Sequence, residues 1–90
     1  MTIFSITSLS TPQALGDAIA RVYPNDHLQI APLVWLVADQ GVTAKDVSDK
    51  LGLSELKVGT GIVISIGGYF GRAPTNVWEW MTAKAAATRA

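Results

Sequence analysis

Apolar positions in the first part of the chain change their spacing from one segment to the next. Residues 1–9 (MTIFSITSL) are rich in apolar and β-branched side chains, which predicts a short strand or an arm. Ser10, Thr11 and Pro12 then supply capping hydroxyls and a first-turn proline, as is typical of a helix start. The apolar residues that follow recur at helical spacing, and they are Leu15, Ala18, Ile19 and Val22.

The longest unbroken apolar run has nine residues, from Ile30 to Ala38. Within it, residues 33–37 (LVWLV) are apolar on nearly every face, which predicts a central helix buried on most sides. Pro32 predicts a kink in this helix or a restart near Ala31. Residues 10–40 are therefore expected to form scaffold helices.

Residues 42–62 (VTAKDVSDKLGLSELKVGTGI) have the pattern of two helices joined by a turn. Thr43 is a good N-cap, and Asp46 three residues later can complete a capping box. Gly52 accepts the left-handed conformation that ends many helices, and Ser54 can cap a second helix. One face of the first helix carries small and apolar residues, namely Ala44, Val47, Ser48 and Leu51.

Residues 47–53 (VSDKLGL) resemble the helix-turn-helix of the lambda-type repressor family, and Val58 matches a β-branched residue inside that family's second helix. The resemblance covers residues 42–62, and the candidate unit extends over residues 42–66. It implies a tri-helical or winged helix-turn-helix fold and a small DNA-binding transcriptional regulator that acts as a dimer. The alternative interpretation is a plain helical hairpin with a glycine turn.

Residues 62–72 (IVISIGGYFGR) allow two interpretations. As a helix, which we favour, they continue a buried stripe, and their glycines allow close helix approach. As a strand, Ile62, Ile64 and Ile66 alternate with Val63 and Ser65, and the two following glycines signal a hairpin. The strand would form a wing, paired with the N-terminal arm or with the chain from residue 69 onward.

Thr75 follows Pro74 and can cap a last helix over residues 75–90. The pattern as a whole therefore predicts one mainly α domain over residues 1–90. Its expected fold class is a small helix-turn-helix-like helical bundle, with a short N-terminal strand or a C-terminal β-wing as the two alternative additions.

Composition bears on partners more than on fold. Hydrophobic residues are 49% and charged residues 16% of the 90-residue chain, which excludes a disordered chain. The apolar fraction is high for a small monomer, so a protein partner or a homodimer is expected. The formal net charge is zero, whereas a domain that depends on phosphate contacts is usually more basic. No membrane partner is expected, because the longest apolar run is too short to cross a bilayer.

The chain contains no cysteine, which excludes disulfides and thiol chemistry and suits a reducing cytoplasm. Its N-terminus has neither the basic region nor the long apolar run of a signal peptide. A cytoplasmic location is therefore expected.

A DNA-binding surface would use the exposed polar residues of the helix-turn-helix and of the wing. Hydroxyl and carboxylate groups of the second helix could contact bases, and basic groups could contact phosphates. The candidate DNA-binding residues are Lys45, Lys50, Ser54, Glu55, Lys57, Thr60 and Arg72.

The second hypothesis is a protein-interaction module of the same fold, an adaptor or inhibitor that does not bind DNA. Trp78 and Trp80 lie two residues apart on the last predicted helix and point about 200° from each other, so one of them is available for an interface. The candidate partner-binding residues are Tyr69, Phe70 and Trp80.

No enzyme is expected. His27 is the only histidine, and although Asp26 is adjacent, no nearby serine, cysteine or second histidine completes a triad or a metal site. The glycines of residues 59–71 lack the spacing of a phosphate loop. The sequence therefore predicts no catalytic site, no metal and no cofactor.

Overall fold

Strand β1 (Thr2–Ser8) is the central element of the fold. The computed structural model describes residues 1–55, 57–68, 71 and 75–86. Successive side chains of a strand point to opposite faces. Phe4 and Ile6 are therefore buried on one face of β1, and Ile3 is buried on the other.

Three further strands extend this centre into an antiparallel sheet. β3 (Val34–Asp39) pairs with one side of β1, and β4 (Gly61–Ser65) pairs with the other. β2 (His27–Ala31) pairs with the far side of β3, so the strand order is β2-β3-β1-β4. β2 and β4 are consequently the two edge strands.

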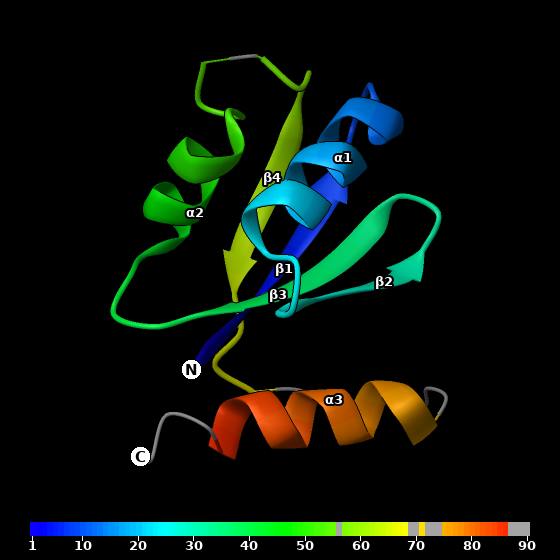
Figure 1. Cartoon of the computed structure of the whole chain (residues 1–90), viewed down its shortest axis with the longest axis vertical. Coiled ribbons are helices and arrows are strands. Elements are labelled where there is room, and N and C mark those ends of the chain that lie inside the picture. The colour runs from blue at the N-terminus through cyan, green and yellow to red at the C-terminus, as the bar shows by residue number, and fades with distance from the viewer. Residues whose placement is uncertain (56, 69–70, 72–74, 87–90) are drawn as a thin grey trace.

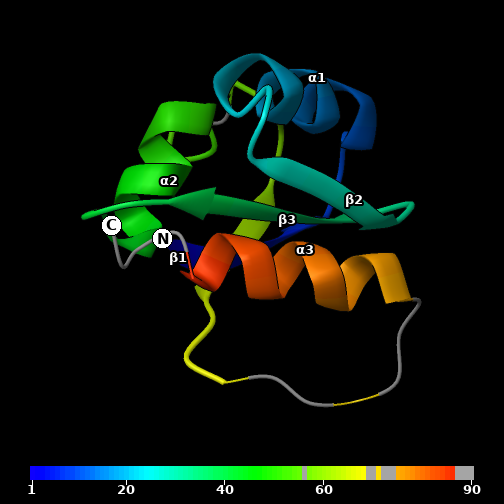
Figure 2. The same ribbon diagram turned by 60° about the horizontal axis from the view of Figure 1, so that its bottom comes forward.

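Helices cover both faces of the sheet (Figures 1 and 2). α1 (Pro12–Val22) and α2 (Ala44–Leu51) lie on one face, and α3 (Thr75–Ala86) lies on the other. The element order β1-α1-β2-β3-α2-β4, combined with this strand order, is the ferredoxin-like or split βαβ arrangement. α3 is an addition to that arrangement.

Each helical layer contributes to its own apolar cluster. The first cluster lies between the sheet and the α1–α2 layer, and its largest fully buried members are Phe4, Ile6, Leu15, Ile19, Val37, Val47 and Leu51. The second cluster lies under α3, and its buried members are Ile3, Leu36, Val77 and Met81. The Cα radius of gyration of 12.4 Å is close to the value of about 12 Å expected for a compact chain of this length.

The predicted signals at the two ends of α2 are confirmed. The hydroxyl of Thr43 accepts from the N–H of Asp46 at 3.2 Å, and the carboxylate of Asp46 accepts from the N–H of Thr43 at 2.8 Å. Gly52 has φ of 87° and ends the helix in the left-handed conformation. The proline-led start of α1, the strand interpretation of residues 1–9 and a helix beginning at Thr75 are confirmed as well.

The prediction of a mainly α domain is wrong, because the structure is an α+β fold built on a four-stranded sheet. Residues 33–37, predicted as part of a buried central helix, lie in β3 and the turn before it. β3 is apolar on both faces because it is an inner strand with helices above and below it. Trp35 and Val37 belong to the first cluster, and Leu36 belongs to the second. A short run that is apolar throughout does not distinguish a buried helix from such a strand.

The expected second helix of the helix-turn-helix is also absent from the described residues between α2 and β4. These residues form turns, and Gly59 adopts φ of 82°, which no helix contains. The helical interpretation of residues 62–72 is wrong for residues 62–65, which lie in β4. The strand interpretation is confirmed for residues 62–65, and so is their pairing with the N-terminal strand.

A methyl group at Gly59 should be poorly tolerated. Its carbon would lie 2.1 Å from Thr11 Oγ1 and 2.4 Å from Ser10 Oγ. Thr11 Oγ1 donates to the carbonyl of Val58, and Ser10 Oγ accepts from the N–H of Thr60, so neither hydroxyl is free to move away. We expect Gly59→Ala to lower the free energy of unfolding by about 2 kcal/mol, from backbone strain plus overpacking.

Urea unfolding would measure this loss, with Gly67→Ala as the control. Apart from its chain neighbours, no heavy atom of the described residues lies within 4 Å of a Cβ placed at Gly67, so that variant should stay within about 0.5 kcal/mol of the wild type. Equal stability of the two variants would show that residues 58–60 do not pack against the start of α1 in this way.

Candidate functional site

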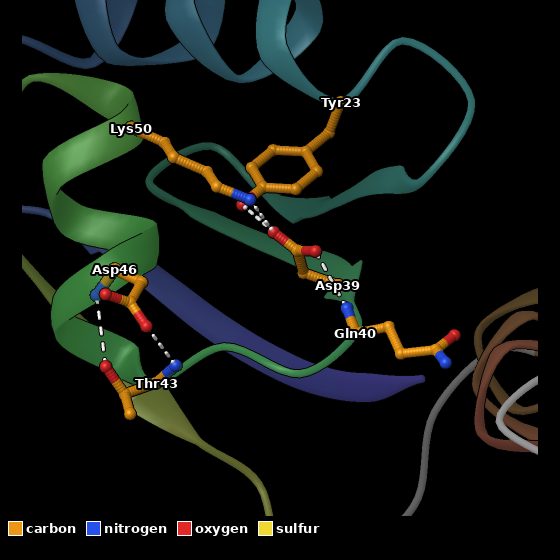
Figure 3. A network of polar contacts seen from close by, with 6 residues as sticks. All are labelled: Tyr23, Asp39, Gln40, Thr43, Asp46 and Lys50. Atoms are coloured by element: carbon orange, nitrogen blue, oxygen red, sulfur yellow. Dashed lines mark hydrogen bonds and ion pairs between the residues drawn. The ribbon is translucent and has the colours of Figure 1, made fainter.

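A polar cluster joins the ends of α1, β3 and α2 (Figure 3). The carboxylate of Asp39, at the end of β3, accepts from the hydroxyl of Tyr23 at 2.8 Å and from the ammonium group of Lys50 at 2.6 Å. Its other oxygen accepts from the N–H of Gln40 at 2.7 Å. The side chain of Asp39 is only 17% exposed. This carboxylate therefore connects both helices of one layer to the sheet beneath them.

The surroundings of this cluster shift two pKa values. Burial of Tyr23, together with its hydrogen bond to the Asp39 carboxylate, raises the pKa of the phenol well above its usual value. Burial alone would raise the pKa of Asp39, but hydrogen bonds from Lys50, Tyr23 and the Gln40 N–H outweigh it and lower that pKa. At neutral pH the tyrosine is therefore protonated and the aspartate ionised, an arrangement that suits a structural link.

The lysines proposed for DNA contact are each paired with a carboxylate. Lys45 lies 2.8 Å from Asp49 on α2, and Lys50 lies 2.6 Å from Asp39. Lys57 lies 3.4 Å from Glu55 in the segment after α2. Basic and acidic groups also line a groove of about 380 Å³ beside α2, whose charged lining residues are Arg21, Asp49, Lys50, Glu55 and Lys57.

Ser54 and Thr60, two further residues of the predicted DNA surface, do not lie on a helix. The Ser54 hydroxyl is 2.9 Å from the Ser48 hydroxyl, in the turn that follows α2. Thr60 is exposed just before β4, and its backbone is bonded to the neighbouring strand and to Ser10. Arg72 lies outside the described residues.

Of the three aromatic residues predicted to bind a partner, only Trp80 lies in a described segment. It is half-buried on α3 and packs, like Trp78, against the second apolar cluster. The ammonium group of Lys84 lies 6.0 Å from the centroid of its ring, and the same group is 2.6 Å from Asp26. Tyr69 and Phe70 fall outside the described residues.

Sequence reasoning missed the exposed apolar surface on β4. Ile62 is 48% and Ile64 is 55% exposed, and both lie on the face of the sheet that α3 covers elsewhere. Ile64 lies opposite Ser5 on β1, and Ser5 lies opposite Leu36 on β3. Leu36 in turn lies opposite Leu28 on β2, so these four residues form one row across the sheet. α3 contacts β1 and β2, so it covers one end of this row and leaves the other open. The alternation of isoleucines in residues 62–66 was the available signal.

The backbone of β4 has one bonded side and one outward side. The N–H of Leu9 donates to Thr60, and the N–H of Ile66 donates to Ile3. In the observed register these bonds place the peptide groups of Ile62 and Ile64 toward β1. The peptide groups that point away from β1 are those of Gly61, Val63 and Ser65. No described strand pairs with them. We call these groups, together with the Ile62 and Ile64 side chains, the β4 surface.

Other features of the described segments offer less to a ligand. A groove of about 320 Å³ between α1 and β2 is lined by residues that include Asp17, His27, Gln29 and Trp35. His27 Nδ1 already lies against the carbonyl of Tyr23. No group of three or more potential metal ligands occurs in this part of the chain. Likewise, none of its helices combines the length and apolar character needed to cross a membrane.

No family model, curated protein or solved structure matches this chain. The function is therefore inferred from the geometry of the chain's own residues.

Replacing Asp39 should reveal how much the polar cluster contributes. We expect Asp39→Asn to lower the free energy of unfolding at pH 7 by about 1–2 kcal/mol, because hydrogen bonds to the charged carboxylate are weakened; the half-exposed Lys50 limits the effect. Since folding lowers the pKa of Asp39, its contribution is present at neutral pH. It should be lost as the pH falls below the unfolded value of about 4.

Chemical denaturation of both proteins between about pH 7 and pH 3 would measure this, and the difference between them should narrow toward low pH. Asp49→Asn, which removes the exposed partner of Lys45, serves as the control and should change stability little. A wild-type advantage that is independent of pH would contradict the role assigned to the carboxylate.

Proposed function

We propose that this domain is a non-enzymatic protein-interaction module that binds its partner by strand addition at the β4 surface. The observation that carries the proposal is an edge strand with two exposed isoleucines beside outward backbone groups that no described strand pairs. Strand addition uses both features, because main-chain hydrogen bonds provide affinity and alternate side chains provide specificity.

The two edges of the sheet differ in a way that supports this choice. Proteins protect free edges with bulges, prolines and charges. β2 carries an irregularity between Gln29 and Ala31, and Pro32 follows it directly. β4 (GIVIS) contains no proline or charged residue and pairs without a register shift. An unprotected, apolar edge strand is expected where the edge has a partner.

DNA binding has less physical support. Reading the major groove usually requires an inserted helix, and the described residues after α2 form turns. The three described lysines of the predicted surface already face carboxylates, which would repel phosphates. We also propose a cytoplasmic location, because a chain without cysteine suits a reducing compartment.

Photo-crosslinking at position 64 would test the interaction surface. In the test variant, a photoreactive phenylalanine analogue replaces Ile64. In the control variant it replaces Ile30, which is 42% exposed on the protected edge. We expect covalent adducts in cells from position 64 at several times the yield from position 30. Equal yields at the two positions, or none at position 64, would overturn the proposal.

Binding to random duplex DNA at low salt provides a separate test. We expect no binding, because the three described lysines of the predicted surface are paired with carboxylates and the net charge is zero. Binding that falls steeply with rising salt would instead support phosphate contacts. Lys57→Ala would then identify whether the segment after α2 makes them.

A further inference from the structure

We propose that the partner of β4 is β4 of a second copy of this chain, paired antiparallel across a two-fold axis at Val63. This inference rests on the proposed function and names its partner. The sequence predicts a dimer, and this inference places the interface of that dimer at β4. The sheet would then continue from one copy into the other.

The backbone of β4 fits this pairing. A two-fold axis at Val63 places Val63 opposite the partner's Val63, and Gly61 opposite the partner's Ser65. These are the residues whose peptide groups point outward. In an antiparallel pair such residues exchange both of their bonds, so the register satisfies the outer edge over the whole strand with about six hydrogen bonds.

The side chains fit the same register. Directly opposite residues point to the same face of a sheet. The axis at Val63 therefore places Ile62 opposite the partner's Ile64, and Ile64 opposite the partner's Ile62. The exposed isoleucines of both copies would form one apolar patch on the face that α3 leaves open. Each isoleucine would contact another across the strand pair, in the close, non-hydrogen-bonded kind of position.

Charge favours a second copy over an unrelated strand. An isologous contact brings each group near its own image, so charged residues at the centre of the strand would repel. β4 contains none, and the chain as a whole has no net charge. The opposite edge is an unsuitable counterpart, because the irregularity in β2 interrupts regular pairing there.

Sedimentation velocity over a range of concentrations would test the association. We expect the wild-type chain to reach twice the mass of one chain. Ile64→Lys should raise the dissociation constant more than tenfold, because it places an ammonium group in the apolar patch. Ile30→Lys, at another exposed position, on the protected edge, should behave as the wild type. Circular dichroism would verify that both variants are folded.

Disulfide trapping would test the register. The chain has no cysteine of its own, so a single introduced cysteine can bond only to its image. At the axis the two Cα atoms of an opposed pair lie about 5.5 Å apart, which a disulfide can bridge. Val63→Cys should therefore form covalent dimers under mild oxidation. Ser65→Cys, whose opposite residue is the partner's Gly61, should not.

Three results would overturn the inference. The first is a wild-type protein that sediments with the mass of a single chain at every concentration. The second is a dimer that Ile64→Lys does not weaken, and the third is trapping at position 65 without trapping at position 63. A single-chain mass combined with crosslinks from position 64 to other proteins would overturn self-pairing and leave strand addition in place. A single-chain mass without such crosslinks would overturn both.

Discussion

The structure depends on the two-sided burial of β1. Its alternating residues must be covered on both faces, and its two edges are paired with β3 and β4. α1 and α2 pack together on one face, whereas on the other face α3 is a single helix whose main strand contacts are with β1 and β2. An edge strand with exposed isoleucines follows from this imbalance. The proposed function uses the part of the sheet that the chain itself does not cover.

Unlike the open edge of β4, the polar cluster around Asp39 has its groups paired within the chain. Its groups bond to one another, and its carboxylate joins the C-terminal end of α1, the end of β3 and the exposed side of α2. α2 packs above β4 on the face opposite Ile62 and Ile64 (Figure 1). The cluster therefore helps to position α2 on β4, on the face opposite Ile62 and Ile64, and leaves the β4 surface uncovered. This division separates the elements that stabilise the fold from the strand that is left to bind.

Local signals in the sequence identified several elements correctly, because each depends on a few adjacent residues. The capping box at Thr43, the left-handed glycine at Gly52 and the proline at the start of α1 are such signals. The fold class was wrong where burial depends on distant neighbours. Residues 33–37 are apolar throughout because β3 is covered on both faces, and this cannot be distinguished locally from a buried helix.

At the candidate site, too, features set by adjacent residues could be predicted, whereas features set by distant residues could not. The alternation in residues 62–66 indicated a strand, and the N-terminal segment was one of its suggested partners. That Ile62 and Ile64 would be exposed could not be inferred, because it depends on how far α3 extends across the sheet. Lys50 looked available for DNA because its carboxylate partner, Asp39, lies elsewhere in the sequence and is brought to it only by folding.

Amide hydrogen exchange along β4 is the most direct test of the central claim that its outer edge is open for pairing. The account predicts slow exchange at Ile62 and Ile64, whose N–H groups bond to β1, at every protein concentration. It predicts fast exchange at Val63 in dilute protein and protection of that amide as the concentration rises. A Val63 amide as protected as that of Ile62 in dilute protein would show that the edge is already satisfied within one chain, which would contradict the account.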